Sequence, residues 1–287
     1  MENQLIEANQ NKRTIGHLLL EAGKLKPQDA DLIVKIQQEQ GLRFGDAAVQ
    51  LGLITQADIM QVVSQQFDYS CLTVGDESID PRVLTAFYSY GQDVESLRAL
   101  RSQLSLRWFT ENKSLVITAP ASKQGSSYIA ANLAVLFAQL GQKILLVDAN
   151  MRHPAQQDLF RIENRVGLSD VLVKRAGLEA IQSISKIENL SLLLSGTIPP
   201  NPLELLGHSR FNALMSQLEE RYDIIIIDTP AMLESADAQA MSAVTKGVLL
   251  VVNKNDTKIA DVDLAKQQIV IAGAEPVGVA LNNAKPS

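Results

Sequence analysis

From residue 114 onward, short apolar runs alternate with longer segments of helical pattern. The apolar runs lie at 114–118, 143–148, 191–196, 223–230, 247–252 and 277–282. Runs of this length made almost entirely of Val, Ile and Leu are typical of strands buried on both faces, which requires a mostly parallel sheet between helices. Helical patterns at 127–141, 208–220 and 258–272 separate some of these runs. This part of the chain is therefore predicted to be an α/β domain with helices flanking the sheet.

The first 70 residues show a different pattern, a tandem repeat. A shift of 29 positions superimposes Gly16 on Gly45 and Gly23 on Gly52. Each copy predicts a short helix that ends at a glycine and is followed by a second helix, which begins near Pro27 in the first copy. The repeat predicts a small all-α domain over residues 1–75. The residues alone leave open whether it is a helical adaptor or a ligand-binding module.

Residues 76–91 lose this periodicity and carry Gly, Pro, Ser and acidic residues. Such a segment is typical of a linker. The second domain is then expected to occupy residues 92–287.

Composition narrows the possible functions. A chain of 287 residues with 46% hydrophobic and 20% charged residues is an ordinary globular protein of one or two domains. A formal net charge of −6 argues against a nucleic-acid partner. One cysteine and three dispersed histidines give no disulfide framework and no zinc pattern. No apolar run approaches the roughly 18–20 residues of a membrane span, and the polar N-terminus does not resemble a secretory signal, so a cytoplasmic protein is expected.

The segment after the first predicted strand is a candidate phosphate-binding loop. Such loops need glycine for close backbone approach, a lysine at the β- and γ-phosphates, and a Ser or Thr on Mg²⁺. Gly125 and Ser127 fit these needs, whereas Ser126 stands where the lysine is expected. Taken alone, the match is weak and favours a plain strand–turn–helix junction.

Two other predicted strands end in carboxylates, Asp148 and Asp228. The carboxyl ends of parallel strands meet at one edge of a sheet, so both acids are expected beside the loop. Carboxylates at such an edge serve to coordinate Mg²⁺ and to activate a hydroxyl. Either acid alone is as well explained by a helix cap or a turn. Both together favour a phosphoryl-transfer site that uses ATP and Mg²⁺.

Most of residues 92–285 resembles the bacterial protein-tyrosine kinases, or BY-kinases, which have a P-loop NTPase fold. The segment LLVDANMRHPAQQDLF resembles their D-x-D-x-R motif, and SGTIPPNPLELLGHSRF, IIIIDTPA and VGVALNN resemble later family segments. The resemblance implies that Asp148 is the base that accepts the tyrosyl proton and that Arg152 is a second catalytic residue. It also implies nucleotide contacts from Lys123, Gly125, Ser126, Ser127 and Asn282, and a metal site of Ser127, Asp148 and Asp228.

A second family motif, E-x-x-R-x-x-R, is present at Glu95, Arg98 and Arg101. Its spacing places the three side chains along one stripe of a helix. The resemblance implies that this stripe joins copies of the chain into a ring, a homo-oligomer.

The resemblance also implies a cellular role. The family acts in exopolysaccharide and capsule assembly with a membrane co-polymerase that determines chain length. This chain resembles the freestanding exopolysaccharide chain-length-determinant branch, the EpsG type. It is therefore expected to be cytoplasmic, without a membrane span of its own, and to be recruited to the inner face of the membrane by that partner.

The N-terminal repeat resembles the N-terminal domain of type II secretion and pilus assembly ATPases. Part of that family binds cyclic di-GMP through an arginine before the first glycine, the glycine turn itself and apolar side chains. The matching residues are Arg13 and Gly16 in the first copy, with Arg13 one position early, and Arg43 and Gly45 in the second. Cyclic di-GMP is thus a possible second ligand.

Three departures from the kinase pattern weaken the predicted catalysis. Ser126 replaces the loop lysine, and Asn150 replaces the second Asp of D-x-D. The last tyrosine is Tyr222, so the family's C-terminal tyrosine cluster is absent. The first hypothesis is a tyrosine kinase with weakened catalysis. The alternative is an inactive scaffold that senses nucleotide, and a lesser alternative is a MinD-like partitioning ATPase, which would carry a lysine at Ala121.

Overall fold

The computed structural model describes residues 14–56, 58–59, 62, 71–163 and 165–282. The chain divides into two compact units. The first consists of Met1–Cys71 with Tyr88–Gly91, and the second of Leu72–Phe87 with Gln92–Ser287. None of the described helices is long and apolar enough to cross a membrane.

The described part of the first unit contains the helices α2 (Ile15–Glu21), α3 (Pro27–Gln40) and α4 (Phe44–Gln50). Gly23 and Gly52 have φ values of +66° and +68°, and each follows the first helix of its repeat copy. Glycine reaches this left-handed conformation without steric cost, which explains why both copies carry it there. Leu19 and Ile33 have no exposed surface and lie at the centre of the unit's apolar core.

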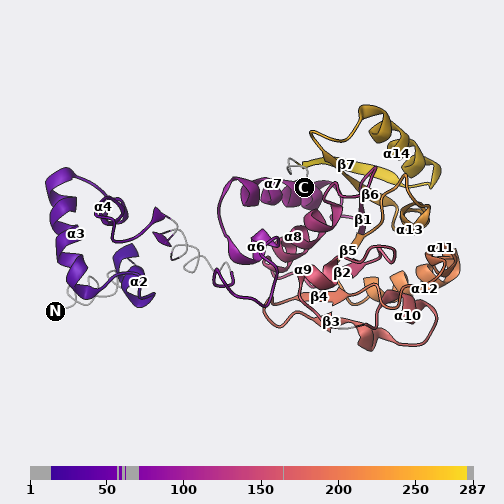
Figure 1. Ribbon diagram of the computed structural model, residues 1–287, viewed down its shortest axis with the longest axis horizontal. Helices are drawn as coiled ribbons and strands as arrows, with labels where there is room; N and C mark the ends of the chain where they lie inside the picture. Colours follow the sequence, from indigo (N-terminus) through magenta and orange to yellow (C-terminus); the bar gives the residue numbers. More distant parts are fainter. Residues whose placement is uncertain (1–13, 57, 60–61, 63–70, 164, 283–287) are drawn as a thin grey trace. The chain divides into compact units, whose positions relative to one another are not determined.

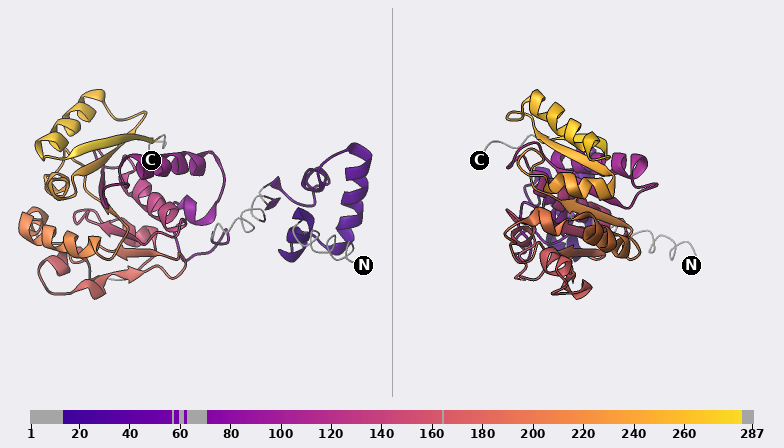
Figure 2. Two further views of the ribbon diagram at one scale, coloured as in Figure 1. Left: turned by 180° about the vertical axis from the view of Figure 1, so that it is seen from behind. Right: turned by 90° about the vertical axis from the view of Figure 1, so that its right-hand side faces the viewer.

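The second unit alternates strands and helices. Its strands are β1 (Ser114–Thr118), β2 (Ile144–Asp148), β3 (Gln182–Ser183), β4 (Leu190–Leu193), β5 (Ile224–Asp228), β6 (Gly247–Asn253) and β7 (Glu275–Asn282). Its helices are α6 (Leu84–Phe87), α7 (Gln92–Arg107), α8 (Ser126–Ala138), α9 (Gln156–Leu159), α10 (Leu168–Leu172), α11 (Pro202–Leu205), α12 (His208–Glu219), α13 (Asp237–Thr245) and α14 (Ile259–Ile271). Figure 1 and Figure 2 show these helices around the sheet.

Within the described residues, seven strands form one sheet in the order β3-β4-β2-β5-β1-β6-β7. β3 pairs antiparallel with β4, and the other pairs are parallel. The predicted mostly parallel α/β sheet is therefore confirmed. Each of the six apolar runs overlaps a strand, and β3 is the strand that the runs do not predict.

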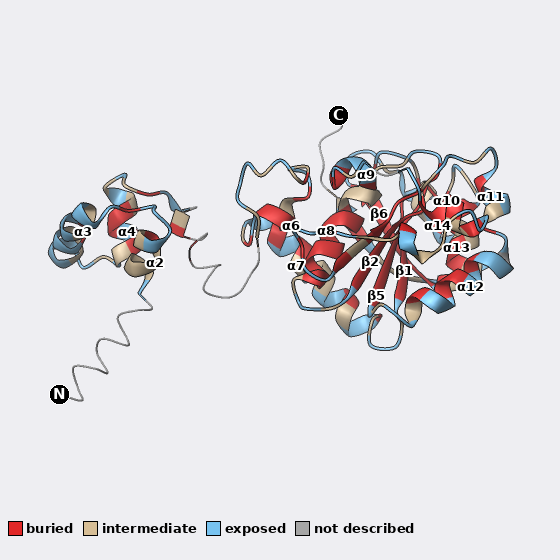
Figure 3. Ribbon diagram, turned by 90° about the horizontal axis from the view of Figure 1, so that it is seen from below, coloured by how far each residue is buried: buried red, intermediate tan, exposed pale blue. Residues whose placement is uncertain are grey.

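Alternate residues of the central strands face opposite layers of helices. In β2, Ile144 and Leu146 belong to the apolar cluster that includes α6, α7 and α8, whereas Leu145 and Val147 belong to the cluster that includes α12, α13 and α14. Figure 3 shows the buried strands between the two layers. Burial on both faces explains why these strands are continuous Val, Ile and Leu runs instead of alternating patterns.

The linker prediction for residues 76–91 is wrong for most of that segment, because Leu72–Phe87 packs within the α/β unit. Ile79 and Val83 are at most 1% exposed and join the same apolar cluster as α8. The fully buried Asn132 of α8 fixes the position of this segment through two hydrogen bonds. Its Oδ1 accepts the Thr85 backbone N–H at 3.0 Å, and its Nδ2 donates to the Arg82 carbonyl at 3.1 Å. These contacts join residues about 50 positions apart, so local composition did not reveal them.

Candidate functional site

The candidate site lies at the carboxyl ends of β1, β2 and β5. Asp148 at the end of β2 is in register with Asp228 at the end of β5, and Asp228 is also in register with Ile117 of β1. The loop that follows β1 leads into α8. As predicted from the strand ends, the fold brings the two carboxylates together at the edge of the sheet where α/β proteins bind ligands.

The loop between β1 and α8 has the backbone of a close-approach turn. Gly125 is the N-cap residue of α8 with φ +99°, and a Cβ there would lie 2.2 Å from Nδ2 of Asn282. A side chain here would be strained by the positive φ and would have to displace the Asn282 amide. Asn282 Nδ2 donates to the Gln124 carbonyl at 3.0 Å, so the end of β7 is hydrogen-bonded to the loop. Lys123 has φ +62°, a conformation that is rare for a non-glycine residue.

The two carboxylates are fully buried in the middle of the site. Asp148 accepts backbone N–H groups from Asn150, Ala155 and Gln156 at 3.2, 3.0 and 2.9 Å. Burial raises the pKa of Asp148 above its ordinary value, and these backbone donors oppose the rise. Burial, and then the neighbouring charge of Asp148, also raise the pKa of Asp228. Two acids held this close resist being ionised together, which is an arrangement that a cation relieves.

Gln156 connects the two acids, and the sequence reasoning did not identify it. Its side chain is fully buried, and its Nε2 donates to Asp228 Oδ2 at 2.8 Å and to the Ser127 carbonyl at 3.2 Å. Its backbone N–H binds Asp148. Gln156 lies in the segment that resembles the D-x-D-x-R region of the family, which was the one available indication. Its distance of eight residues from Asp148 matches no motif, so the sequence does not distinguish it from a surface glutamine.

Asp228 Oδ1 is buried and makes no hydrogen bond to the described residues. An unpaired buried carboxylate oxygen is costly unless a ligand satisfies it. The hydroxyl of Ser127 lies within hydrogen-bonding reach of the same carboxylate. Among the described residues there is no cluster of three or more His, Cys, Asp or Glu side chains that could hold a metal. Mg²⁺ needs no such cluster, because it binds through one or two carboxylates, water and substrate phosphates.

Arg152 follows β2 in the chain and is engaged in an ion pair. Its Nε and Nη2 atoms contact the two carboxylate oxygens of Asp237 at 2.8 and 3.2 Å. Asp237 is 1% exposed, so Arg152 compensates a buried charge. Asn150 lies nearby, and its Oδ1 accepts the His153 backbone N–H at 3.1 Å.

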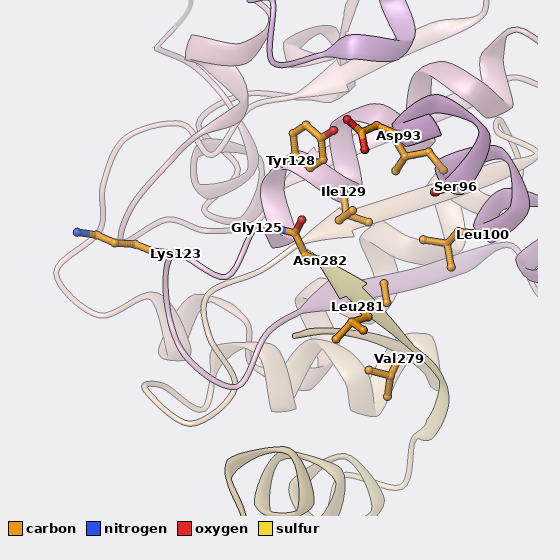
Figure 4. A pocket seen from close by; sticks show the side chains of 12 residues that line it. Asp93, Ser96, Leu100, Lys123, Gly125, Tyr128, Ile129, Val279, Leu281 and Asn282 are labelled. Carbon is orange, nitrogen blue, oxygen red and sulfur yellow. The ribbon is translucent and has the colours of Figure 1, made fainter. Parts of the chain in front are cut away.

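Two cavities adjoin the loop. One of about 720 Å³ is lined by Ser126, Ser127, Asn150 and Arg152, among others. The other, of about 630 Å³, lies between α7, α8 and β7 and is lined by Asp93, Tyr128 and Asn282, among others (Figure 4). Lys123, Gly125 and Tyr128 line both cavities. The loop therefore adjoins one cavity lined by Asn150 and Thr229, the neighbours of the two buried acids, and a second cavity beside the edge strand β7.

Comparison with known proteins identifies the family. Residues 117–269 match the model of the AAA domain family. The tyrosine-protein kinase YwqD of Bacillus subtilis is 37% identical over 194 residues, which cover 67% of this chain and 82% of that protein. The crystal structure of the chimerical protein CapA2B2 has a TM-score of 0.68 and 35% identity, covering 79% of this chain and all of that one. The chain belongs to the bacterial tyrosine-kinase family.

Other similar proteins share only part of their length with this chain or only its fold. The tyrosine-protein kinase Etk of Escherichia coli is 35% identical over 191 residues, which cover 66% of this chain but 26% of that protein. The kinase domain of the same protein has a TM-score of 0.63 with 33% identity, covering 68% of this chain and 78% of that structure. MinD of Pyrococcus horikoshii, at 24% identity over 58% of this chain and 68% of that one, and a TM-score of 0.50, shows the fold alone.

In this member of the tyrosine-kinase family, the predicted ring residues make contacts within the chain. Arg98 pairs with Glu95 at 2.8 Å, and Arg101 donates to the Leu136 carbonyl of α8 at 3.2 Å. Glu95 is 62% exposed and remains accessible on α7. Oligomer formation stays a prediction.

The cyclic di-GMP residues lie in the other unit. Arg13 lies outside the described residues, and Arg43 is the exposed N-cap residue of α4. Gly16 and Gly45, which the resemblance assigns to the ligand turns, lie in the first turns of α2 and α4. Gly45 is buried, and a Cβ there would approach Ile59 Cδ1 to 2.9 Å. These glycines permit close helix packing, and ligand binding stays a prediction.

Replacing Gln156 by leucine should lower the free energy of unfolding at pH 8 by about 1–3 kcal/mol, because Asp228 loses a buried charged hydrogen bond. Urea unfolding followed by circular dichroism measures this change. Gln157→Leu, at the adjacent exposed position, is the matched control and should stay within about 0.5 kcal/mol of the parent. Equal effects of the two substitutions would show that Gln156 does not hold the acids.

Proposed function

We propose that this kinase-family chain is an ATP- and Mg²⁺-dependent protein-tyrosine kinase with weakened catalysis that acts in exopolysaccharide chain-length control. The observation that carries the proposal is the buried pair Asp148 and Asp228 beside a loop whose Gly125 adopts a positive φ that other residues rarely reach. Named tyrosine kinases among its relatives support the reaction class.

The two cavities support a nucleotide that crosses the loop. The phosphates would lie in the cavity with Ser126 and Ser127, and the base would lie between α7, α8 and β7 near Asn282. Ser127 and Asp228 would hold Mg²⁺, since Asp228 Oδ1 has no other partner among the described residues. When bound, Mg²⁺ neutralises charge on the transferring phosphoryl group.

Asp148 would accept the proton of the substrate tyrosine. Among the described residues, its Oδ1 accepts a single hydrogen bond, at 3.2 Å from Asn150, so this oxygen keeps acceptor capacity. The raised pKa of Asp148 brings its proton affinity closer to the operating pH, as a general base requires. Arg152, the second predicted catalytic residue, would contribute its positive charge at the wall of the phosphate cavity while it remains paired with Asp237.

Weakened catalysis follows from the missing loop lysine. Ser126 offers a neutral hydroxyl where a cation normally stabilises the charge that develops on the phosphates. Loss of one such preorganised contact costs about 10²–10³ in rate. Asn150 stands where the D-x-D motif has its second Asp, so the proposed metal site has one negative charge fewer.

The test uses the purified full chain. Calorimetry should detect MgATP binding. The rate at which ADP is formed should be below the turnover of ~1 s⁻¹ that is typical of slow kinases. Phosphotyrosine should accumulate slowly on a Glu-Tyr copolymer, and Asp148→Ala should abolish it. No binding of MgATP would refute the nucleotide site, and binding without phosphotyrosine would refute the kinase.

The second candidate function is an inactive nucleotide-sensing scaffold of the polysaccharide export machinery. Ser126 and the engagement of Arg152 with Asp237 favour it, because both leave the phosphates with fewer cations. Binding of MgATP without turnover distinguishes it from the kinase. A MinD-like ATPase is less favoured, because Ala121 stands where that class has a lysine.

In either case we place the chain in a homo-oligomer that a membrane co-polymerase recruits to the inner face of the membrane. The helix with Glu95, Arg98 and Arg101 would supply the contact between copies. Cyclic di-GMP remains a candidate ligand of the N-terminal unit, with Arg43 as its exposed cation.

A further inference from the structure

Three lysine or arginine side chains line the cavity that adjoins the phosphate loop: Arg82, Lys123 and Arg152. The proposed function needs one of them near the phosphates, because Ser126 provides no charge. Which of them can contact a phosphate depends on its present hydrogen-bond and ion-pair partners and on the free energy needed to leave them.

Arg152 is poorly suited to a phosphate contact. Its guanidinium satisfies both oxygens of Asp237, which is 1% exposed. Moving the guanidinium to a ligand would leave a buried carboxylate unpaired, which is strongly unfavourable.

Lys123 is poorly suited for a different reason. It is exposed, and no hydrogen bond or ion pair to the described residues holds its side chain in the cavity with Ser126 and Ser127. A long flexible side chain on an exposed loop loses rotamer entropy when it is ordered.

Arg82 combines a rigid backbone with a guanidinium that is easily released. Its carbonyl accepts Nδ2 of Asn132 on α8, the helix that begins with Ser126 and Ser127. Its own N–H binds Asp80 Oδ1 at 2.9 Å, and the Asp80 N–H binds the Leu159 carbonyl at 2.9 Å. The turn is thus attached to both α8 and α9.

Among the described residues, the guanidinium of Arg82 forms its ion pair with Asp80, a partly exposed acid in its own turn, and also feels the charge of Asp158. It contacts Asp80 at 2.9 and 3.2 Å, with its side chain 65% exposed. An exposed pair of this kind contributes little to stability, so a phosphate can replace the carboxylate at small cost. A guanidinium also binds phosphate oxygens in a bidentate manner.

We propose that Arg82 binds the terminal phosphate of the nucleotide and supplies the cation that the loop lacks at Ser126. Arg82 lines the cavity beside the acids and is absent from the described lining of the cavity assigned to the base. This placement favours contact with the outermost phosphate. The inference rests on the proposed nucleotide site, and it assigns a substrate contact to the segment before α7.

The experiment compares two nucleotides on the full chain. Calorimetric titrations with Mg²⁺ and either AMP-PNP, which carries the third phosphate, or ADP, which lacks it, are made for the parent, Arg82→Ala and Arg82→Lys. Arg82→Ala should weaken AMP-PNP binding about tenfold or more, as for a lost charged hydrogen bond, and change ADP binding less than twofold. Arg82→Lys should recover part of the loss. Arg210→Ala, which removes an exposed arginine of α12, is the matched control and should change neither.

The outcomes separate this inference from the proposed function. If the parent binds both nucleotides and Arg82→Ala binds each of them with the affinity of the parent, Arg82 does not contact the phosphates and the proposed nucleotide site is retained. Equal weakening of both nucleotides, or a lowered melting temperature of the free protein, would assign Arg82 a structural role instead. If the parent binds neither nucleotide, the proposed site and the Arg82 contact are both refuted.

Discussion

Replacing Ser126 by lysine should tighten MgATP binding and raise turnover by up to about 10²–10³-fold, the usual effect of one preorganised charge contact. The frame that such a lysine needs is present. Gly125 provides the left-handed turn, Ser127 follows it in α8, and Asp148 and Asp228 lie at the adjacent strand ends. The cavity of about 720 Å³ that Ser126 lines has room for the longer side chain. Calorimetry and ADP release on the full chain measure both quantities.

Three variants test the cause of this gain. Ser126→Met adds similar length without charge and should give no gain. Asp148→Ala, added to Ser126→Lys, should remove the gain in turnover, because the restored charge needs the acidic side of the site. Arg82→Ala should matter less in the Ser126→Lys variant than in the parent, because two groups that serve the same phosphate are not additive. If the parent already turns over ATP at ~1 s⁻¹ and Ser126→Lys changes nothing, the weakened-site interpretation is wrong.

The parts of the fold that the sequence predicted are those set by local chemistry. The continuous apolar runs predicted the central strands because a strand buried on both faces has no polar side. The proximity of Asp148 and Asp228 followed from the same reasoning, since each ends a neighbouring parallel strand. In the first unit, Gly23 and Gly52 marked helix ends because both require positive φ.

The parts that it did not predict depend on contacts between distant residues. The pair Arg152–Asp237 joins residues 85 positions apart, and no local pattern marks Asp237 as its partner. Two-residue β3 is too short to show periodicity. The resemblance assigned Gly45 to a ligand-binding turn, whereas its position in α4 and its packing against Ile59 become visible only in the structure. The sequence thus placed the loop and the two acids at one edge of the sheet but omitted Gln156, which joins them through long-range hydrogen bonds.

The ionisation of Asp228 should make the stability of the metal-free protein fall as pH rises. Burial and the charge of Asp148 raise the pKa of Asp228 from 3.8 to about 7. Between these two values the folded protein holds a proton that the unfolded chain has lost. The stabilising contribution is therefore complete below about pH 4 and is lost as pH rises through about 7. For Asp228 the loss is on the order of 4 kcal/mol, at 1.36 kcal/mol for each unit of pKa.

Asp228→Asn should remove most of this dependence, because its amide stays neutral at every pH. Urea unfolding in the presence of EDTA should give the variant a higher free energy of unfolding than the parent at pH 8, with a much smaller difference at pH 5. Asp263→Asn, at an exposed position of α14, is the matched control and should leave the profile of the parent unchanged. Mg²⁺ with ATP should restore stability to the parent at pH 8, because a bound cation favours the ionised pair. Parallel profiles for the parent and Asp228→Asn would mean that the acid pair is already ionised in the folded protein, and that its buried charge is balanced without a cation.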